Sequence, residues 1–362
     1  MTWRKVLWTT VVCVAWACAL VFGPGLMRAE VALGTADRES ADTATTIPVA
    51  KRVAPANPEL VKLPFSFPAG MENTPVLYKG RPLLVQNRRS TKRDEQEQAD
   101  LFIGDLVTGQ EVAKLGVGFS FVSAMVNGEE MNVFGTRNTN LEWTKDVYRF
   151  WSSDLKTWRQ ELVVAREDKD EHLFNTSVCR DEAGYVMAYE FSTGGSAHWA
   201  FRFARSKDLV KWDKVPDLAF ADLAEMSFCA CPALRYCAPH YYVIYGIERE
   251  KGLGKHYQYQ LPTTKYAAAL ARSKDLATWE VSPCRGPMLD PIPGEGINNT
   301  DADLVEYEGN TYVYYGTGDQ ATWGTIRVAM YAGPMKEMFE AHFPNGVPTI
   351  KLDARQRKYL YP

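Results

Sequence analysis

The chain has 362 residues, of which 46% are hydrophobic and 12% aromatic. A chain of this composition can bury a large core, and its length alone would allow two domains. The formal net charge is −3, and the basic residues cluster only over residues 88–93. Because nucleic-acid binding needs a basic surface, we exclude nucleic acid as a partner.

The N-terminal residues predict export. Residues 1–29 begin with two basic side chains, Arg4 and Lys5, and continue as a nearly unbroken apolar run. This pattern is typical of a signal peptide, and the run is also long enough to be an uncleaved membrane anchor. Residues 30–60 lack hydrophobic periodicity and predict a disordered spacer. We therefore expect a folded domain over residues 61–362, located outside the cytoplasm in the periplasm or the extracellular space.

A short phrase, Ser-x-Asp-Leu-x-x-Trp, occurs three times in the expected domain. The copies run from Ser152 to Trp158, from Ser206 to Trp212 and from Ser273 to Trp279. Each copy follows a run of alternating apolar residues, which predicts a strand that ends in a turn. Fainter copies over residues 99–106 and 326–335 bring the number to five. Repetition on this scale predicts a repeat architecture.

A pair of apolar strands precedes each copy of the phrase. In the third unit, for example, residues 175–178 are followed by a stronger strand over residues 185–189. The five units begin at residues 73, 121, 175, 231 and 301. Their spacing suits four-stranded antiparallel blades with loops of variable length. An open solenoid would leave unpaired sheet edges, so we predict an all-β fold, a five-bladed β-propeller.

The five units and their strand-end phrase resemble the five-bladed β-propeller glycoside hydrolases, the superfamily that includes families 43, 32, 68, 117 and 130. The resemblance spans about residues 65–345. It implies a funnel where the innermost strands begin, with catalytic carboxylates on blades one, three and four. At those positions this chain has Asn73, Asn175 and Ala230, so the usual carboxylates are replaced. Neither an amide nor a methyl group can transfer a proton in their place.

Other acids lie where the repeat predicts the funnel. Asp301 occupies in the fifth unit the position that Asn175 holds in the third, and Asp303 shares its face of the strand. Two acids so close should raise the pKa of one of them. Glu190 ends a strand whose antiparallel return brings it beside Asn175, and Glu72 precedes the first unit. Glu190, Asp301, Asp303 and Glu72 are the candidate catalytic residues, although a turn cap, a channel cation ligand or a solvated strand end would explain each equally simply.

Several other polar residues are candidates for binding the substrate. Arginine at the funnel rim could hold a carboxylated or sulfated sugar, and a histidine is expected in a nearby loop. The candidate substrate-binding residues are Asn73, Asn175, Arg88, Arg137 and His172. We predict no metal ligands and no cofactor, with a channel cation near Asp301 as the alternative. The five cysteines beyond the N-terminal segment are interpreted as structural thiols.

Together these features favour a glycoside hydrolase that acts on an extracytoplasmic poly- or oligosaccharide in the propeller funnel. The alternative is a carbohydrate-binding propeller without catalysis. A third hypothesis, a lyase or phosphorylase, depends on Arg88 and Arg137 forming a phosphate or uronate site. We expect a monomer that is anchored to a membrane if the N-terminal segment is not removed.

Overall fold

The computed structural model of the chain describes residues 56–67, 72–88, 100–138, 143–193, 200–221, 229–248, 266–284, 287–318, 323–344 and 349–351. All of them belong to one unit of the chain, residues 54–362. The predicted signal peptide or membrane anchor, and residues 30–55 of the predicted spacer, lie outside the described residues. Asn57 and Leu60, from the end of that spacer, contact the folded unit. Within the described part of the chain, no helix has the length and hydropathy needed to cross a membrane.

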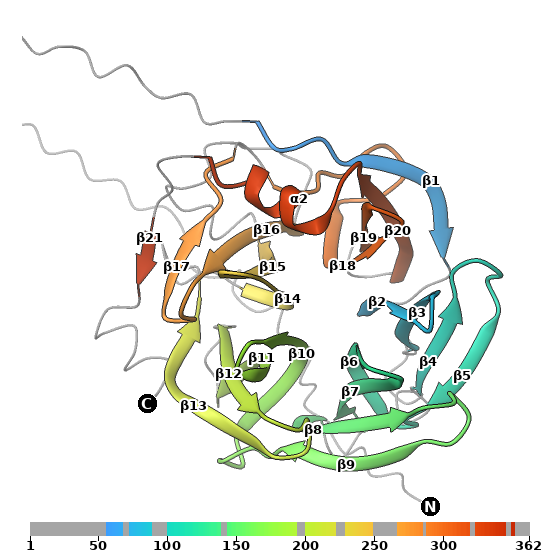
Figure 1. Ribbon diagram of the computed structural model, residues 1–362, viewed down its shortest axis with the longest axis vertical. Helices are drawn as coiled ribbons and strands as arrows, with labels where there is room; N and C mark the ends of the chain where they lie inside the picture. Colours follow the sequence, from blue (N-terminus) through green and yellow to red (C-terminus); the bar gives the residue numbers. More distant parts are fainter. Residues whose placement is uncertain are drawn as a thin grey trace, which may run out of the picture. The chain divides into compact units, whose positions relative to one another are not determined.

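Three four-stranded antiparallel sheets follow one another along the chain (Figure 1), and we call them blades 1 to 3. Blade 1 contains β2 (Asn73–Tyr78), β3 (Arg81–Arg88), β4 (Asp100–Asp105) and β5 (Glu111–Leu115). Blade 2 contains β6 (Phe119–Asn127), β7 (Glu130–Asn138), β8 (Trp143–Ser152) and β9 (Arg159–Val164). Blade 3 contains β10 (Glu171–Asp181), β11 (Gly184–Thr193), β12 (Ala200–Ser206) and β13 (Trp212–Phe220).

The remaining strands form two further blades, which a single parallel pair, Tyr266 with Asn298, joins into one sheet. Blade 4 contains β14 (Cys229–Cys237), β15 (His240–Glu248), β16 (Tyr266–Ser273) and β17 (Thr278–Val281). Blade 5 contains β18 (Asn298–Tyr307), β19 (Asn310–Gly318) and β20 (Trp323–Tyr331), and β1 (Val61–Phe67) pairs with β20 as its outermost strand. The blades surround a central axis with β2, β6, β10, β14 and β18 innermost (Figure 1), which confirms the predicted propeller.

Both ends of the described unit add pieces that the repeat did not predict. Strand β1 comes before the first repeat unit in sequence but completes the last blade, so it closes the ring. At the other end, β21 (Thr349–Lys351) extends blade 4 by pairing with β17. The fifth copy of the phrase, expected over residues 326–335, lies on β20 and the turn after it, and the chain then forms helix α2 (Met335–Ala341). Its Phe339 is fully buried and stacks on Tyr242 at 4.5 Å between ring centroids.

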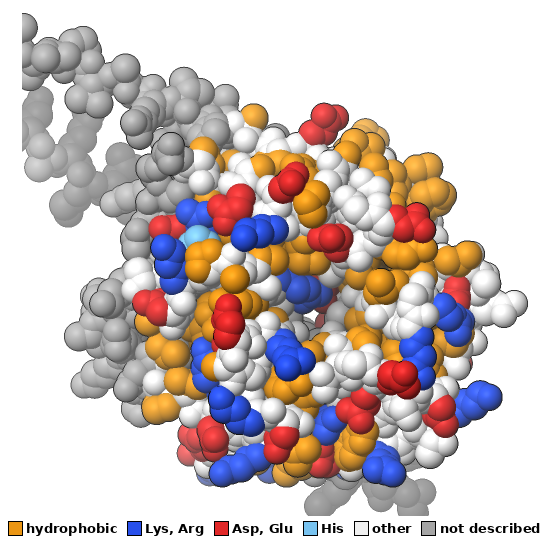
Figure 2. Space-filling view, in the orientation of Figure 1, with side chains coloured by type: hydrophobic (Ala, Val, Ile, Leu, Met, Phe, Trp, Pro, Cys, Tyr) orange, Lys and Arg blue, Asp and Glu red, His pale blue; other side chains and the backbone are white. Residues whose placement is uncertain are grey.

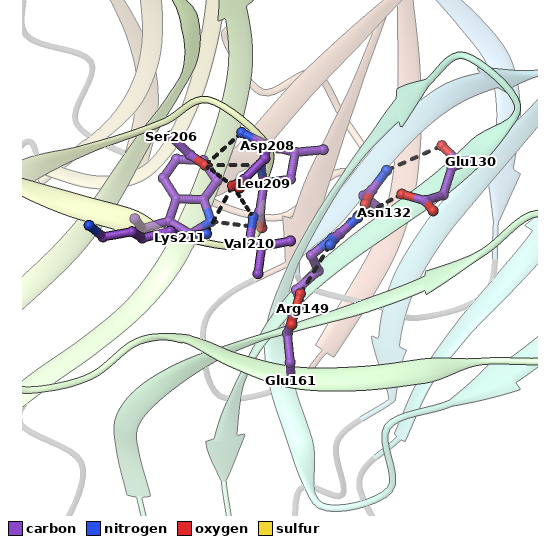
Figure 3. A network of polar contacts seen from close by, with 10 residues as sticks. Glu130, Asn132, Arg149, Glu161, Ser206, Asp208, Leu209, Val210 and Lys211 are labelled. Carbon is purple, nitrogen blue, oxygen red and sulfur yellow. Dashed lines mark hydrogen bonds and ion pairs between the residues drawn. The ribbon is translucent and has the colours of Figure 1, made fainter.

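The repeated phrase forms a turn between the third and fourth strands of a blade, shown for blade 3 in Figure 3. The Asp208 carboxylate accepts hydrogen bonds from the backbone N–H groups of Val210 and Lys211, at 2.9 and 3.0 Å. The Ser206 hydroxyl accepts one from Leu209, which has a left-handed φ of 66°. These local bonds satisfy the backbone at the turn and explain why Ser and Asp recur there.

The tryptophans of the phrase pack against the preceding blade. Trp212 of blade 3 meets Phe134 of blade 2 edge-on, at 6.2 Å between ring centroids. Trp279 of blade 4 stacks on Phe203 of blade 3 at 5.9 Å. Large aromatic rings bury much apolar surface, so the repeated phrase stabilises the ring of blades. These tryptophans therefore have a structural role.

Candidate functional site

The innermost strands of blades 2 to 5 share an irregularity at the same position. In each strand the register with its neighbour shifts, and one residue has a left-handed backbone conformation. These residues are Phe121, Asn175, Cys231 and Asp301, with φ of 59°, 42°, 51° and 51°. Non-glycine residues seldom adopt this conformation, and it is concentrated at functional sites. All four are starting residues of the predicted units, so the sequence alignment of these units is confirmed.

The bulge of blade 4 lies at Cys231, the first residue of the fourth predicted unit. Ala230 still pairs regularly with Gly246, and the register shift comes after it. In a regular strand, Cys229 and Cys231 would point to the same face. The bulge breaks that alternation: Cys229 belongs to the hydrophobic core, whereas Cys231 lines the channel.

The innermost strands surround a small cavity in the central channel. Its volume is about 20 Å³, which is room for one water-sized group. The lining residues come from all five blades and are Glu72, Asn73, Thr74, Val122, Asn175, Thr176, Cys231, Pro232, Asp301, Ala302 and Asp303. Five predicted site residues therefore share one cavity wall: Glu72, Asn73, Asn175, Asp301 and Asp303. Two of them are joined directly, since the Asn73 amide donates to the Asp301 carbonyl at 2.9 Å.

Glu190 lies directly behind the cavity wall and is 1% exposed. Its Oε2 accepts hydrogen bonds from the Asn175 amide at 2.8 Å and from the Cys231 backbone N–H at 3.0 Å. The predicted proximity to Asn175 is thus confirmed. Burial, together with the charges of Asp301 and Glu72, raises the pKa of Glu190 to about 8 against the effect of the two hydrogen bonds. Because both donors bind Oε2, the proton present at neutral pH lies on Oε1.

The thiol of Cys231 is part of the same network. The Asn175 amide donates to its Sγ at 3.3 Å. Burial raises the pKa of this thiol well above its usual range, and the nearby carboxylates of Asp301 and Glu190 add to the effect. The group is therefore a neutral thiol and a poor nucleophile. Cys231 was not predicted as a site residue, although it is the first residue of the fourth predicted unit.

Asp303 has a different environment from Asp301, two residues away. It accepts a hydrogen bond from the Arg235 guanidinium and one from the Leu304 backbone N–H at 2.7 Å. Arg235 also donates to the backbone carbonyl of Leu234 at 2.9 Å. Burial raises the pKa of Asp303, and Arg235 opposes that shift. The ion pair joins the innermost strands of blades 4 and 5. We therefore interpret Asp303 as a residue that stabilises the cavity wall.

Three predicted substrate-binding residues are not among those that line the cavity. Arg88 forms ion pairs with Asp100 at 2.7 Å and Glu111 at 2.8 Å. Arg137 is exposed, with its guanidinium over the rings of Phe119 and Tyr148. His172, which was expected in a loop, lies on β10 three residues before Asn175. The phosphate or uronate site that depended on the two arginines therefore has no support at the cavity.

A second cavity, of about 270 Å³, has largely apolar walls. Arg235, the partner of Asp303, lines it together with Arg180, Glu306 and Met335, the first residue of α2. Figure 2 shows the face that carries α2, with a hollow near its centre and basic side chains beside that hollow. Arg235 thus contacts the second cavity and also pairs with an acid that lines the first.

The described ranges contain no group of three or more His, Cys, Asp or Glu side chains that could hold a metal ion. The five cysteines beyond the N-terminal segment are all free thiols. The channel cation near Asp301 stays a prediction.

Comparisons with known proteins agree with the fold. A solved glycoside hydrolase aligns over 78% of this chain and 90% of its own length, with 15% identity and a TM-score of 0.53. A variant of the Bombyx mori GH32 β-fructofuranosidase BmSUC1, in complex with sucrose, aligns over 73% and 61%, with 16% identity and a TM-score of 0.53. A variant of the GH43 protein BlXynB from Bacillus licheniformis aligns over 82% and 61%, with 12% identity and a TM-score of 0.52.

At these identities the likeness establishes the fold and nothing finer. No protein-family model matches the chain, and no curated protein does. The chain spans only 61% of the silkworm and Bacillus chains. The protein has the fold of the propeller-type glycoside hydrolases, as the repeat and its strand-end phrase predicted.

Proposed function

We propose that this protein is a glycoside hydrolase that acts on an extracytoplasmic poly- or oligosaccharide at the central cavity. One observation carries the proposal: three carboxyl groups, those of Glu72, Glu190 and Asp301, gather at the cavity, and one of them is protonated at neutral pH. Glycoside hydrolysis needs a proton donor and a carboxylate in the same site. The fold supports this proposal, because it is the fold of enzymes with that chemistry.

The environments of the carboxyl groups suggest their roles. Glu190, whose pKa is raised to about 8, is the candidate general acid, because it holds its proton until a leaving oxygen needs it. Asp301, held at the cavity wall by a strained bulge, is the candidate base or nucleophile, with Glu72 as the second candidate. The Asn73 and Asn175 amides would position the sugar. Asp303 takes no part in proton transfer in this scheme, since it is paired with Arg235.

A specific observation also favours the carbohydrate-binding alternative. Glu190 is 1% exposed and lies behind Asn175 and Cys231, so a proton on it reaches the cavity only if these residues move. In addition, at the positions where the resemblance implies carboxylates this chain has Asn73, Asn175 and Ala230. A propeller of this kind could hold a sugar without cleaving it.

One experiment separates the two functions. The purified protein is incubated with a broad glycan panel, and both reducing-sugar release and calorimetric binding are measured. We expect cleavage of at least one glycan, and a loss of about a hundredfold or more in Glu190→Gln and in Asp301→Asn. The exposed Glu129→Gln serves as the control and should keep full activity. Full activity in both site variants would refute the assignment, and binding without cleavage by the natural protein would establish the alternative.

A further inference from the structure

Two buried amide oxygens at the cavity have no hydrogen-bond partner. Asn73 and Asn175 are 4% and 8% exposed, and both line the cavity. Neither Oδ1 atom accepts a hydrogen bond in the described structure. Leaving a buried acceptor unsatisfied costs about 1–3 kcal/mol, so two of them in one small cavity indicate a ligand that supplies donors.

The donor atoms of the same amides are already engaged. The Asn73 Nδ2 donates to the Asp301 carbonyl at 2.9 Å. The Asn175 Nδ2 donates to Glu190 Oε2 at 2.8 Å and to Cys231 Sγ at 3.3 Å. These bonds fix the orientation of both amides, so that only their oxygens remain for a ligand. The cavity therefore offers acceptors from both amides.

The charged side chains that line the cavity are acidic. Glu72, Asp301 and Asp303 line it, and none of its lining residues is Lys, Arg or His. Among the residues that the structure describes, the guanidinium of Arg235 lies nearby, and it is already paired with Asp303. Phosphate, sulfate or a uronic acid would bring like charge into this space, at a cost that no lining cation offsets. The arrangement instead favours a group that carries positive charge.

The size of the cavity limits that group further. The space of about 20 Å³ admits one water-sized group, so a single substituent of a sugar, and not its ring, would occupy it. A hydroxyl group fits but brings a single donor, which leaves one amide oxygen unsatisfied. A primary ammonium group has similar size, three donors and a positive charge. It can satisfy both amide oxygens and still interact with a carboxylate.

We propose that the cavity recognises the protonated primary amine of an amino sugar, held by Asn73 Oδ1, Asn175 Oδ1 and the negative charge of Asp301. This inference rests on the proposed function, because it names the class of sugar whose substituent enters the same cavity. N-acetylation would abolish recognition, since it removes the charge and adds bulk that the cavity cannot hold. A neutral sugar with a hydroxyl group at that carbon would bind more weakly.

The test uses the full-length protein and matched ligands. Oligosaccharides of gluco, galacto and manno configuration are prepared in three forms, with an amine, a hydroxyl or an acetamide at the same carbon. Binding is measured by calorimetry at about pH 6, where a primary amine is protonated. For at least one configuration we expect the amine form to bind about tenfold or more tightly than the hydroxyl form, and the acetamide form not to bind.

Variants at Asn73 separate recognition from a structural role. Asn73→Leu removes the acceptor, so the amine form should lose about tenfold in affinity. Asn73→Asp restores an acceptor and adds charge, so binding of the amine form should recover and the preference for amine over hydroxyl should grow. Asn57→Leu is the matched control, because Asn57 also donates to a backbone carbonyl, at 2.7 Å, but lies outside the cavity lining. A purely structural role would weaken the amine and hydroxyl forms equally in both Asn73 variants, and that result would overturn the inference.

The remaining outcomes distinguish this inference from the proposed function. If a hydroxyl or acetamide form is cleaved in preference to the amine form, the amino-sugar inference falls and the glycoside hydrolase proposal stands. If such a form binds best and no form is cleaved, the inference falls and the carbohydrate-binding alternative is established. If methylammonium or spermidine binds as tightly as every amino sugar, the inference also falls, because the sugar is then not recognised. If no glycan of any form is bound or cleaved, both proposals fall.

Discussion

Two buried carboxyl groups lie at opposite ends of blade 3, and their surroundings differ. Asp181 is next to the tight turn between β10 and β11, where it binds the Arg205 guanidinium at 2.8 Å and accepts hydrogen bonds from the Tyr241 hydroxyl and the Ala183 N–H. Burial would raise the pKa of Asp181, but these partners outweigh it and lower the pKa. Glu190, at the cavity end, has only neutral donors, and its pKa is raised. The same sheet thus stabilises one carboxylate and keeps the other group protonated.

Several other buried acids resemble Asp181 rather than Glu190. Each of them forms an ion pair with a Lys or Arg side chain. The pairs are Asp100 with Arg88, Asp105 with Arg81, Glu171 with Arg202, Glu295 with Lys62 and Asp303 with Arg235. Among the residues that the structure describes, Glu190 has no such partner. An uncompensated buried acid is costly, which is why perturbed acids of this kind are concentrated at functional sites.

The largest expected effect is on the pH dependence of stability. The pKa of Glu190 is about 8 in the folded protein against an ordinary value of 4.5, so the folded state holds an extra proton between these values. The stability that this extra proton contributes is complete below pH 4.5 and is lost as the pH rises toward about 8. Across this window we expect the free energy of unfolding to fall by about 4 kcal/mol from this group.

Urea denaturation at a series of pH values measures this effect. Glu190→Gln cannot ionise, and its amide oxygen can still accept from Asn175 and Cys231, so the variant should lack the decline. The exposed Glu129→Gln, in contrast, should follow the natural protein. Parallel curves for the natural protein and Glu190→Gln would show that Glu190 ionises at its ordinary pKa, and the contrast with Asp181 would disappear.

The second prediction removes the cation from Asp181. Arg205→Leu leaves that carboxylate buried without its ion pair, and we expect a loss of about 2 kcal/mol at neutral pH. The pKa of Asp181 is lowered in the natural protein, so the stability it contributes is present above its ordinary value of 3.8 and is lost in acid. The penalty of the variant should therefore shrink as the pH falls. Lys211→Leu, which removes an exposed lysine 3.9 Å from Asp213, should change stability little.

Much of this arrangement follows from the sequence, because a blade repeats its pattern locally. The starting residues of the innermost strands were predicted from alternating apolar residues, and the antiparallel return placed Glu190 beside Asn175. The bulge at Cys231 was not predicted, because an extra residue in a strand leaves no signature in hydrophobic periodicity. Strand β1 was missed for a different reason. Its partner β20 comes from the opposite end of the domain, and pairing between such distant segments has no local signal.

Charged residues at strand ends were the least predictable part of the site. Arg88 and Arg137 were placed at the funnel because their strands end there. Long side chains at such positions reach neighbouring residues of their own blade, as Arg88 reaches Asp100 and Arg137 covers Phe119. Strand position alone therefore does not determine where a guanidinium binds, whereas the short side chains of Asn73 and Asp301 remain where the backbone places them.

The smallest expected effect tests which partner of Asp181 matters most. Tyr241→Phe removes one neutral donor to Asp181 and also the acceptor of an Arg205 hydrogen bond at 3.0 Å, but it leaves the Arg205–Asp181 ion pair and the Ala183 N–H in place. We expect a loss of about 1 kcal/mol in urea denaturation. The pKa of Asp181 should rise but stay below its ordinary value, because the cation remains. A loss as large as that of Arg205→Leu would mean that a neutral donor stabilises this carboxylate as well as a cation does. The lack of a cation at Glu190 would then no longer distinguish a functional acid from a structural one, and the assignment of Glu190 would depend on activity measurements alone.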